Sequence, residues 1–176
     1  LLDFDFENNI IKDLAENYEV SEDGKTWIFK IREDVKFSDG QKLTAKDVAF
    51  TFNKTKEIGT TFDFKLLEKA EALDDKTVKF TFSAPCSTFI YNAANLGIVA
   101  EHAYKDTNTY SSNPIGSGPY KLVSYTQGQQ LILDRNEEYY GTKPKFKRLT
   151  LVTMTPDTAL ASIKAGDIDI VNVSEA

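Results

Sequence analysis

Apolar residues in this chain follow two different spacings in turn, and this alternation predicts a mixed α/β fold. Residues 78–82 alternate apolar and polar side chains, which is the spacing of a half-buried strand. Thr44 and Asp47 have the spacing of a helix capping box, and the apolar residues Val48 and Phe52 that follow share one helical face. Strand-like and helix-like segments therefore succeed one another, as in α/β chains.

Three further features combine a turn or cap signal with an apolar pattern, and each predicts a defined element. They are a strand at residues 27–31 after the turn at 23–25, a short helix after Pro85 capped by Ser87, and a hairpin formed by residues 120–125 and 130–135.

The last part of the chain predicts a strand–helix–strand unit. Residues 149–153 are strand-like, Thr155 begins a helix, Gly166 ends it, and residues 168–173 are strand-like again. Three apolar residues are expected to form the buried face of this helix: Ala159, Leu160 and Ile163. Such a unit requires a parallel strand pair with a right-handed crossover.

Chain-breaking residues are densest at 111–119, which carries three serines, an asparagine, two prolines and two glycines. This composition is typical of loops between structural units. We therefore expect the chain to cross between two subdomains here, with a boundary between residues 112 and 113.

Composition excludes several functional classes. The formal net charge is −6, whereas a nucleic-acid partner requires clustered Lys and Arg to neutralise phosphates. The single cysteine, Cys86, cannot form an intramolecular disulfide, and the single histidine, His102, excludes His-rich metal sites. No apolar run approaches the roughly 20 residues of a membrane helix. The chain starts at Leu1 without Met, and we expect that an N-terminal piece was removed.

Motifs for bond chemistry are weak, and each has a structural interpretation that we prefer. Ser117 between two glycines favours a turn over a catalytic serine, and residues 3–7 favour a loop over a calcium site. Asp167 and Asp169 favour a solvated strand edge, and His102 favours a hydrogen-bonded surface residue. The basic residues of 143–148 favour a solvated loop over an anion site. We predict no catalytic residue, metal site or cofactor.

Seven segments, in order along the chain, resemble motifs of the oligopeptide/dipeptide solute-binding proteins of ABC importers, the bacterial solute-binding protein family 5. They are LAENYEVSEDGKTW at 14–27, IREDVKFSDGQKLTAKDV at 31–48, DDKTVKFTFSAP at 74–85, IVAEHAY at 98–104, NPIGSGPY at 113–120, RNEEYYG at 135–141 and AGDIDI at 165–170. The chain departs from the family pattern at Ala100 and Glu101, where Pro-Lys is usual, and at Tyr140, where Trp is usual.

The resemblance implies a type II periplasmic-binding-protein fold, in which two lobes enclose a ligand between them. Members are several-fold longer than this chain. The resemblance therefore implies that this chain is a truncated first lobe with a mixed sheet. Residues 1–112 would form the extra α/β subdomain of peptide-binding members, and residues 113–176 would form part of the lobe's core. The second lobe is expected to be absent from this chain.

The family's function implies capture of a peptide and its delivery to the permease of the importer, without bond chemistry. Cleft residues implied by position in the family are Phe62, Phe64, Asn95, Leu96, Gly97, Gly118 and Tyr120, although a core role for the phenylalanines is an equal alternative. Nickel-chelate binders carry an Arg near residues 95–97, where this chain has none, and this disfavours a nickel chelate. Another small solute, such as a nickel chelate or an opine, is the alternative to a peptide.

Further expectations follow from the same resemblance. The full-length protein is expected to be a monomer on the periplasmic or extracellular face of the membrane, lipid-anchored in a Gram-positive source. Two other functions remain open. The first is a hydrolase that uses Asp167, Asp169 or Glu137, and the second is a sensor or chaperone domain of the same fold.

Overall fold

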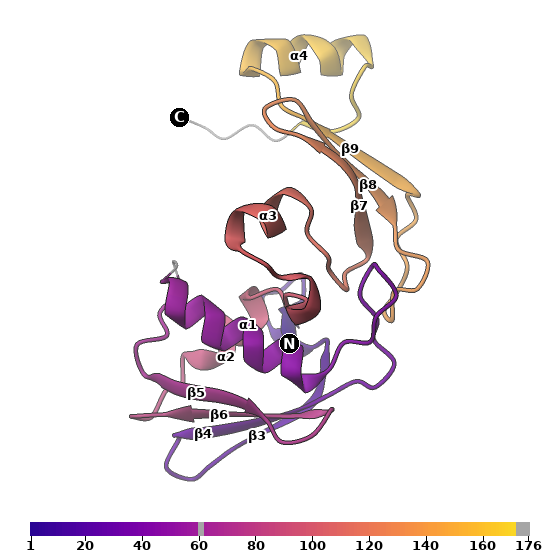
Figure 1. Cartoon of the computed structure of the whole chain (residues 1–176). Coiled ribbons are helices and arrows are strands. Elements are labelled where there is room, and N and C mark those ends of the chain that lie inside the picture. Colours follow the sequence, from indigo (N-terminus) through magenta and orange to yellow (C-terminus); the bar gives the residue numbers. More distant parts are fainter. Residues whose placement is uncertain (60–61, 172–176) are drawn as a thin grey trace.

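The computed structural model describes residues 1–59 and 62–171, and its α/β architecture agrees with the prediction (Figure 1). The strands are β1 (Leu2–Phe4), β2 (Ile10–Lys12), β3 (Ala15–Val20), β4 (Thr26–Ile31), β5 (Leu67–Ala72), β6 (Thr77–Phe82), β7 (Tyr120–Thr126), β8 (Gln130–Arg135) and β9 (Arg148–Val152). The helices are α1 (Ala45–Ile58), α2 (Phe89–Asn95), the 3₁₀ turn η1 (Glu101–Ala103), α3 (Thr107–Ser112) and α4 (Pro156–Ala165).

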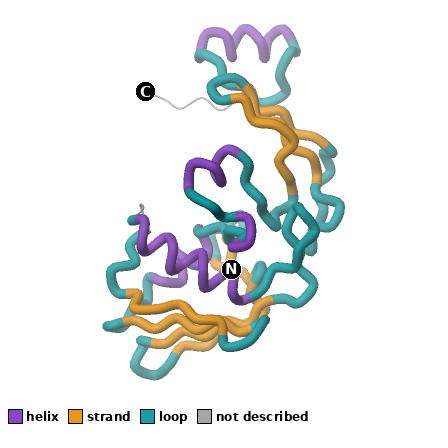
Figure 2. The backbone as a smooth tube through the Cα atoms, viewed as in Figure 1, coloured by secondary structure: helices purple, strands orange, loops and turns teal. Residues whose placement is uncertain are grey.

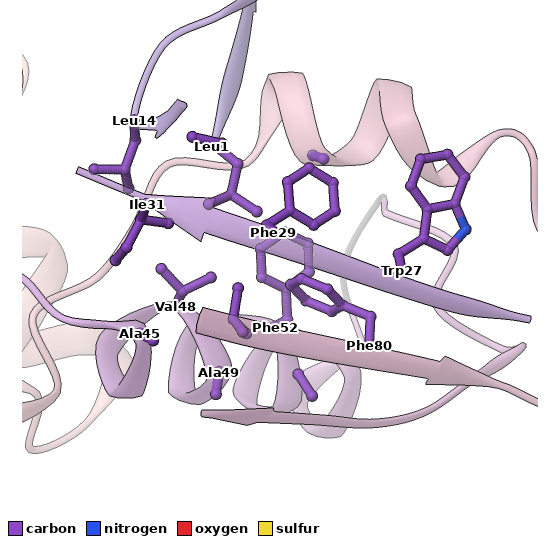
Figure 3. Close-up of a cluster of buried hydrophobic side chains, with 14 of the residues drawn as sticks. Leu1, Leu14, Trp27, Phe29, Ile31, Ala45, Val48, Ala49, Phe52 and Phe80 are labelled. Carbon is purple, nitrogen blue, oxygen red and sulfur yellow. The ribbon is translucent and has the colours of Figure 1, made fainter. Parts of the chain in front are cut away.

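The main core lies on one face of a four-stranded sheet with strand order β3-β4-β6-β5. Both α1 and α2 cover this face, because Phe52 of α1 and Phe89 of α2 each place a ring centroid 4.8 Å from that of Phe80 in β6. Phe29 of β4 packs edge-on against Phe80 at 5.6 Å (Figure 3). Aromatic pairs in such edge-to-face and tilted arrangements stabilise a core beyond the area they bury. The opposite face of the sheet is mainly polar: its cross-strand row consists of Glu19, Ile28, Lys79 and Glu71.

The start of α1 confirms the predicted capping box. The Asp47 carboxylate accepts a hydrogen bond from the Thr44 amide at 2.9 Å, and the Thr44 side chain accepts one from the Lys46 amide at 3.3 Å. Val48 and Phe52 are fully buried, so the predicted helical face is also confirmed. The cap satisfies amides that have no partner within the helix, and this fixes where α1 begins.

The cap predicted for α2 is wrong by one residue. Thr88, not Ser87, occupies the N-cap position, and it makes no side-chain cap hydrogen bond. Instead, the Phe89 amide donates to the Cys86 carbonyl at 3.3 Å, so a backbone turn precedes the helix. Burial of Phe89 and Ala93 against the sheet therefore positions α2 without a side-chain cap.

Strands β7, β8 and β9 form a separate antiparallel meander. The predicted hairpin is confirmed, with Gly128 in the turn at φ 71°. The register places Tyr125, Leu131 and Leu151 in one cross-strand row, and Leu122, Leu133 and Leu149 in another on the same face. This sheet therefore has one apolar face and one mainly polar face. Figure 2 shows the loop after α3 running from the helical layer to this sheet.

The predicted strand–helix–strand unit is only partly confirmed. β9 and α4 form as expected, with Pro156 in the first turn and Gly166 in the left-handed conformation at the C-cap. Residues 168–171 are not in a strand, and residues 172 and 173 lie outside the described part of the chain. All three sheets of the described residues are antiparallel, so the expected mixed sheet is wrong here. A strand forms only with a paired neighbour, which apolar spacing in a sequence does not supply.

The buried face predicted for α4 is also partly wrong. Ala159 is buried, but Leu160 is 54% exposed and Ile163 is only partly buried. Figure 1 places α4 beyond the end of the three-stranded sheet rather than across its face. The helical spacing identified a helix, but no opposing layer within the described residues covers Leu160.

Several contacts join the three-stranded sheet and its loops to the rest of the molecule. The Ser38 amide donates to the Gly116 carbonyl at 2.8 Å, and Lys36 pairs with Glu138 at 3.1 Å. Within the described residues no helix is long and apolar enough to cross a membrane.

Candidate functional site

Two of the predicted cleft segments lie next to each other. Phe64 is buried and packs edge-on against Phe52 at 5.5 Å, and Phe62 stacks on Phe64 at 6.0 Å. The Asn92 side chain of α2 donates to the Asp63 carbonyl at 3.4 Å, which ties this segment to the helix that ends at Asn95. Phe64 thus belongs to the core, as the alternative interpretation expected, whereas Phe62 is only partly buried.

The segment 95–97 follows directly from the end of α2. Asn95 is exposed, and its side chain donates to the Tyr91 carbonyl at 2.9 Å. Leu96 is the C-cap residue, and its partly buried side chain packs against the core. Gly97 is exposed, with open space where a side chain would begin. These residues offer one amide side chain and an accessible stretch of backbone, which suits hydrogen bonding to an extended ligand.

The remaining predicted residues, Gly118 and Tyr120, lie at the start of β7. The Asn136 side chain donates to the Gly118 carbonyl at 3.0 Å, and the Tyr120 hydroxyl donates to the Phe146 carbonyl at 3.0 Å. Gly118 and Tyr120 thus bond residues that follow β8 and precede β9, whereas the Asn92–Asp63 hydrogen bond joins segment 62–64 to the helix that leads into 95–97.

Buried polar side chains of α1 hold the segment that follows Gly97. The Thr51 hydroxyl accepts a hydrogen bond from the Val99 amide at 2.9 Å and donates to the Asp47 carbonyl at 2.7 Å. The Asp47 carboxylate accepts from the Glu101 amide at 3.1 Å. Sequence reasoning assigned Asp47 only its capping role and did not identify Thr51. The position of residues 95–97 thus depends on a network centred on α1.

The Tyr110 side chain holds the loop that leads to Gly118. The Tyr110 hydroxyl of α3 donates to the Ile115 carbonyl and accepts from the Ala100 amide, the latter at 3.2 Å. Burial raises the pKa of Tyr110, so this hydroxyl stays protonated at neutral pH. The hydroxyl therefore fixes the loop 113–119 relative to the segment after Gly97.

A second cluster that sequence reasoning missed joins residues far apart in the chain. The Tyr140 hydroxyl donates to the Asp13 carboxylate at 2.7 Å, and the Arg32 guanidinium lies 5.6 Å from the centre of the Tyr140 ring. Burial and the Asp13 carboxylate together raise the pKa of Tyr140. No short motif contains these three residues, so only the fold could reveal them.

Two hollows flank α1, and none of the seven predicted residues lines either of them. One, of about 200 Å³, lies between α1 and α3; the other, of about 450 Å³, lies between α1 and β5. Aromatic and hydroxyl side chains dominate the first: Phe50, Thr51, Thr55, Tyr104, Thr107 and Tyr110. Charged side chains are prominent in the second: Lys46, Lys54, Glu57, Glu71 and Glu101.

The three acidic groups considered for hydrolysis lie at two places in the fold, one after β8 and two after α4. Glu137 is exposed and receives a hydrogen bond from Arg135 at 2.7 Å, which lowers the pKa of its carboxyl group. General acid catalysis requires the opposite shift. Asp167 and Asp169 follow the end of α4 outside any strand. Across residues 1–59 and 62–171, no three His, Cys, Asp or Glu side chains cluster as metal ligands would. His102 instead bonds Asp39 at 2.7 Å, as expected of a hydrogen-bonded surface histidine.

Comparison with known proteins identifies the family. Residues 9–176 match the bacterial extracellular solute-binding proteins, family 5. The chain belongs to this family. It is 37% identical to the probable D,D-dipeptide-binding periplasmic protein DdpA of Escherichia coli K12, over 90% of this chain and 33% of that protein. The resemblance seen in the sequence motifs is therefore confirmed.

Two solved structures share the fold of this chain. The structure of NikZ from Campylobacter jejuni in complex with Ni(L-His) aligns with a TM-score of 0.89 and 31% identity, over 96% of this chain and 36% of that one. The oligopeptide-binding protein AppA of Bacillus subtilis, in complex with a nonapeptide, aligns with a TM-score of 0.83 and 29% identity, over 96% and 36%. The chain thus has the type II periplasmic-binding-protein fold and spans about a third of the length of these relatives.

Proposed function

We propose that this chain is part of the substrate-binding component of an ABC importer, which captures peptides outside the membrane and delivers them to the permease. The observation that carries this proposal is the family match over residues 9–176 together with 37% identity to a probable dipeptide-binding protein. The nonapeptide complex of AppA adds support from a related structure. Another small solute, such as a nickel chelate or an opine, is the alternative ligand. A sensor or chaperone role is the alternative function.

The mechanism that we propose is capture by closure, without bond chemistry. In it, residues 1–112 form the extra subdomain of the first lobe, residues 113–176 form part of its core, and a second lobe lies outside this chain. A ligand shifts a clamp toward its closed state only through contacts that both lobes make together. We therefore expect this chain to supply about half of the direct contacts to the ligand.

The proposed ligand-binding residues of this half are Phe62, Phe64, Asn95, Leu96, Gly97, Gly118 and Tyr120. The link between Asn92 and Asp63 supports treating residues 62–64 and 95–97 as one wall. In that wall, the exposed Asn95 and the backbone at Gly97 would bond the main chain of a peptide, and the partly buried Phe62 would contact apolar side chains. Phe64 would act by supporting Phe62, with which it stacks.

Location and assembly form the remaining part of the proposal. The match to extracellular solute-binding proteins supports a site of action in the periplasm or at the outer surface of the cell membrane. We propose that the full-length protein is a monomer, that it carries a lipid anchor if the source is Gram-positive, and that it is not an enzyme.

Native mass spectrometry of the longest form that the gene encodes tests the proposal. We expect peptides to co-purify, and a co-purifying metal chelate or opine would favour the alternative ligand.

Isothermal titration calorimetry on the 176-residue chain is the second test. Micromolar binding requires about −8 kcal/mol. Half of the contacts cannot offset the entropy lost on association, so we expect millimolar affinity or weaker. Micromolar affinity for the chain alone would refute the two-lobe mechanism.

A further inference from the structure

The hollow between α1 and α3, called the α1–α3 hollow, is not explained by the proposed function, because none of the seven proposed ligand-binding residues lines it. Its volume is about 200 Å³. An apolar cavity of about 150 Å³ takes one benzene ring, whereas pockets for drug-sized ligands measure about 300–1,000 Å³. The α1–α3 hollow is therefore large enough for one ring with a small substituent and too small for a peptide.

Hydroxyl-bearing side chains line much of the hollow, but most of their hydroxyl groups are already bonded within the protein. Four of them donate to backbone carbonyls: Thr51, Thr55, Tyr110 and Ser111. A hydroxyl group donates one hydrogen bond, so these four have no donor left for a ligand. The surface that remains for contact is apolar, and it includes the side chains of Phe50, Ile58 and Val99.

One polar group of the lining is still available to a ligand. The hydroxyl groups of Tyr104 and Thr107 bond each other at 2.8 Å. Only one of them donates in that bond, so the other keeps a proton that has no acceptor in the described part of the chain. Lys54 adds a charge to the lining, but Glu57 pairs with it at 2.9 Å. The hollow therefore suits a ligand with an apolar ring, one polar atom and no charge.

We propose that the α1–α3 hollow binds a small uncharged molecule that consists of one apolar ring with a single polar atom, as in a phenol, and that this molecule regulates the proposed peptide site. A small molecule fits better than a second protein. A stable protein interface buries about 1,200 Å² or more, and a hollow for one ring cannot supply that area. The binding step is independent of the proposed function, whereas the regulatory step rests on it.

Two residues that line the hollow also hold the backbone beside the proposed peptide site. The Thr51 hydroxyl accepts a hydrogen bond from the Val99 amide at 2.9 Å. The Tyr110 hydroxyl accepts one from the Ala100 amide at 3.2 Å and donates to the Ile115 carbonyl, so it joins two segments that are each close in sequence to proposed ligand-binding residues. A ring packed against Thr51 and Tyr110 restrains both side chains, so part of the ordering cost is met before a peptide binds. We therefore expect the small molecule to tighten peptide binding.

Fluorine NMR titration of the 176-residue chain with 4-fluorophenol tests the binding step. We expect saturable binding with a Kd of about 1 mM, because so small a ligand buries little surface. 4-Fluorobenzoate has the same ring with a negative charge. We expect it to bind about tenfold more weakly, because its carboxylate would lose water without gaining a partner. Equal or tighter binding of the benzoate, or no saturable binding of the phenol, would overturn the proposal.

Variants that fill one hollow or the other separate specific binding from a general affinity for apolar probes. Ser111→Leu enlarges an exposed side chain that lines the α1–α3 hollow, and Ile58→Trp does so from α1 if the first variant fails to fold. Each is expected to abolish saturable binding of 4-fluorophenol. Ala72→Leu is the matched control, because Ala72 lines the other hollow, between α1 and β5, and this variant should bind the probe as the parent chain does. Unchanged binding by the filled variants, or equal loss in the control, would overturn the proposal.

The longest form that the gene encodes should bind 4-fluorophenol with similar affinity. Loss of binding in that form would overturn the proposal, because another part of the protein would then fill the hollow.

Peptide titrations of this longest form, with and without saturating 4-fluorophenol, test the regulatory step. We expect about fivefold tighter peptide binding with the probe, and by linkage the same factor for the probe when peptide is present. Tyr110→Phe keeps the ring that lines the hollow and loses both hydrogen bonds, so it should retain probe binding and lose this coupling. Unchanged peptide affinity with the probe, or coupling that survives in Tyr110→Phe, would overturn the regulatory step.

Amide hydrogen exchange on the 176-residue chain checks the regulatory step without a peptide. The probe is expected to slow exchange at the Val99 and Ala100 amides, which Thr51 and Tyr110 hold, and unchanged exchange there would overturn this step. Absence of peptide binding by the longest form without the probe would refute the proposed function instead, so the two failures are distinguishable.

Discussion

Replacing Asp47 by Ala tests whether one side chain holds both the start of α1 and the segment after the proposed ligand wall. Asp47 is 6% exposed, and its two carboxylate oxygens accept hydrogen bonds from different amides. One accepts from the Thr44 amide at 2.9 Å within the capping box, and the other accepts from the Glu101 amide at 3.1 Å. Both bonds disappear in Asp47→Ala, and neither amide makes another hydrogen bond within the described residues.

The expected loss of stability follows from these two bonds. Removing a helix cap costs about 1 kcal/mol, and leaving a partly buried amide unpaired costs about 1–2 kcal/mol more. We therefore expect Asp47→Ala to lower the free energy of unfolding by about 2–3 kcal/mol. For a chain of this size, such a loss corresponds to a fall in Tm of about 8 °C.

Differential scanning calorimetry and amide hydrogen exchange together check this prediction. Asp157→Ala is the matched control, because Asp157 lies in the first turn of α4 and is exposed, so its loss is expected to cost under about 1 kcal/mol. The Glu101 amide should exchange faster in Asp47→Ala and unchanged in the control. Equal melting temperatures for the two variants, or unchanged exchange at Glu101, would refute the argument that Asp47 links α1 to this segment.

Three other perturbations have defined outcomes. Phe80→Ala, at the centre of the aromatic core, should lower the free energy of unfolding by about 3–5 kcal/mol in urea titrations, and a loss under about 1 kcal/mol would show that the ring is not packed. The Arg148 hydrogen bond lowers the pKa of Asp134, so stability from this pair is present above the unfolded value of about 3.9 and is lost as pH falls toward the folded pKa. Asp134→Asn should accordingly flatten the fall of Tm in acid, and an unchanged pH profile would contradict this. Tyr140→Phe removes the hydrogen bond to Asp13 and should speed amide hydrogen exchange in β7–β9 more than in β3–β6. Equal acceleration in both sheets would contradict the view that this bond holds the three-stranded sheet to the rest of the molecule.

Local signals in the sequence predicted those elements whose cause is itself local. Thr44 and Asp47 lie three residues apart, and the bonds they make depend only on the first turn of α1. The spacing of Val78 and Phe80 results from a strand with one buried face, and the hairpin is determined by the turn that contains Gly128. In each case the interacting groups are neighbours in the chain, so spacing alone identifies them.

Apart from the cap of α2, which was misplaced by one residue, predictions failed where the deciding partner lies far away in the sequence. Residues 168–170 have an apolar spacing that suits a strand, but they pair with no neighbour and form none. Leu160 has the spacing of a buried helical residue and is exposed, because no layer covers it. Conversely, β5 carries alternating charges that gave no clear signal, yet it pairs along β6 and packs beneath α1. The free energy of strand pairing depends on the side chains of both strands, so the sequence of one strand alone does not predict it.

The order of the motifs along the chain was enough to identify the family, because seven collinear segments constrain a fold more than any one of them does. The amino-acid sequence thereby determined the family, the main core elements and the caps that begin α1 and α4. Only the tertiary structure decided that Asn92 joins residues 62–64 to the end of α2, and that Tyr140 reaches Asp13. These contacts join groups separated by up to 127 positions, and their geometry exists only once the sheets and helices have packed.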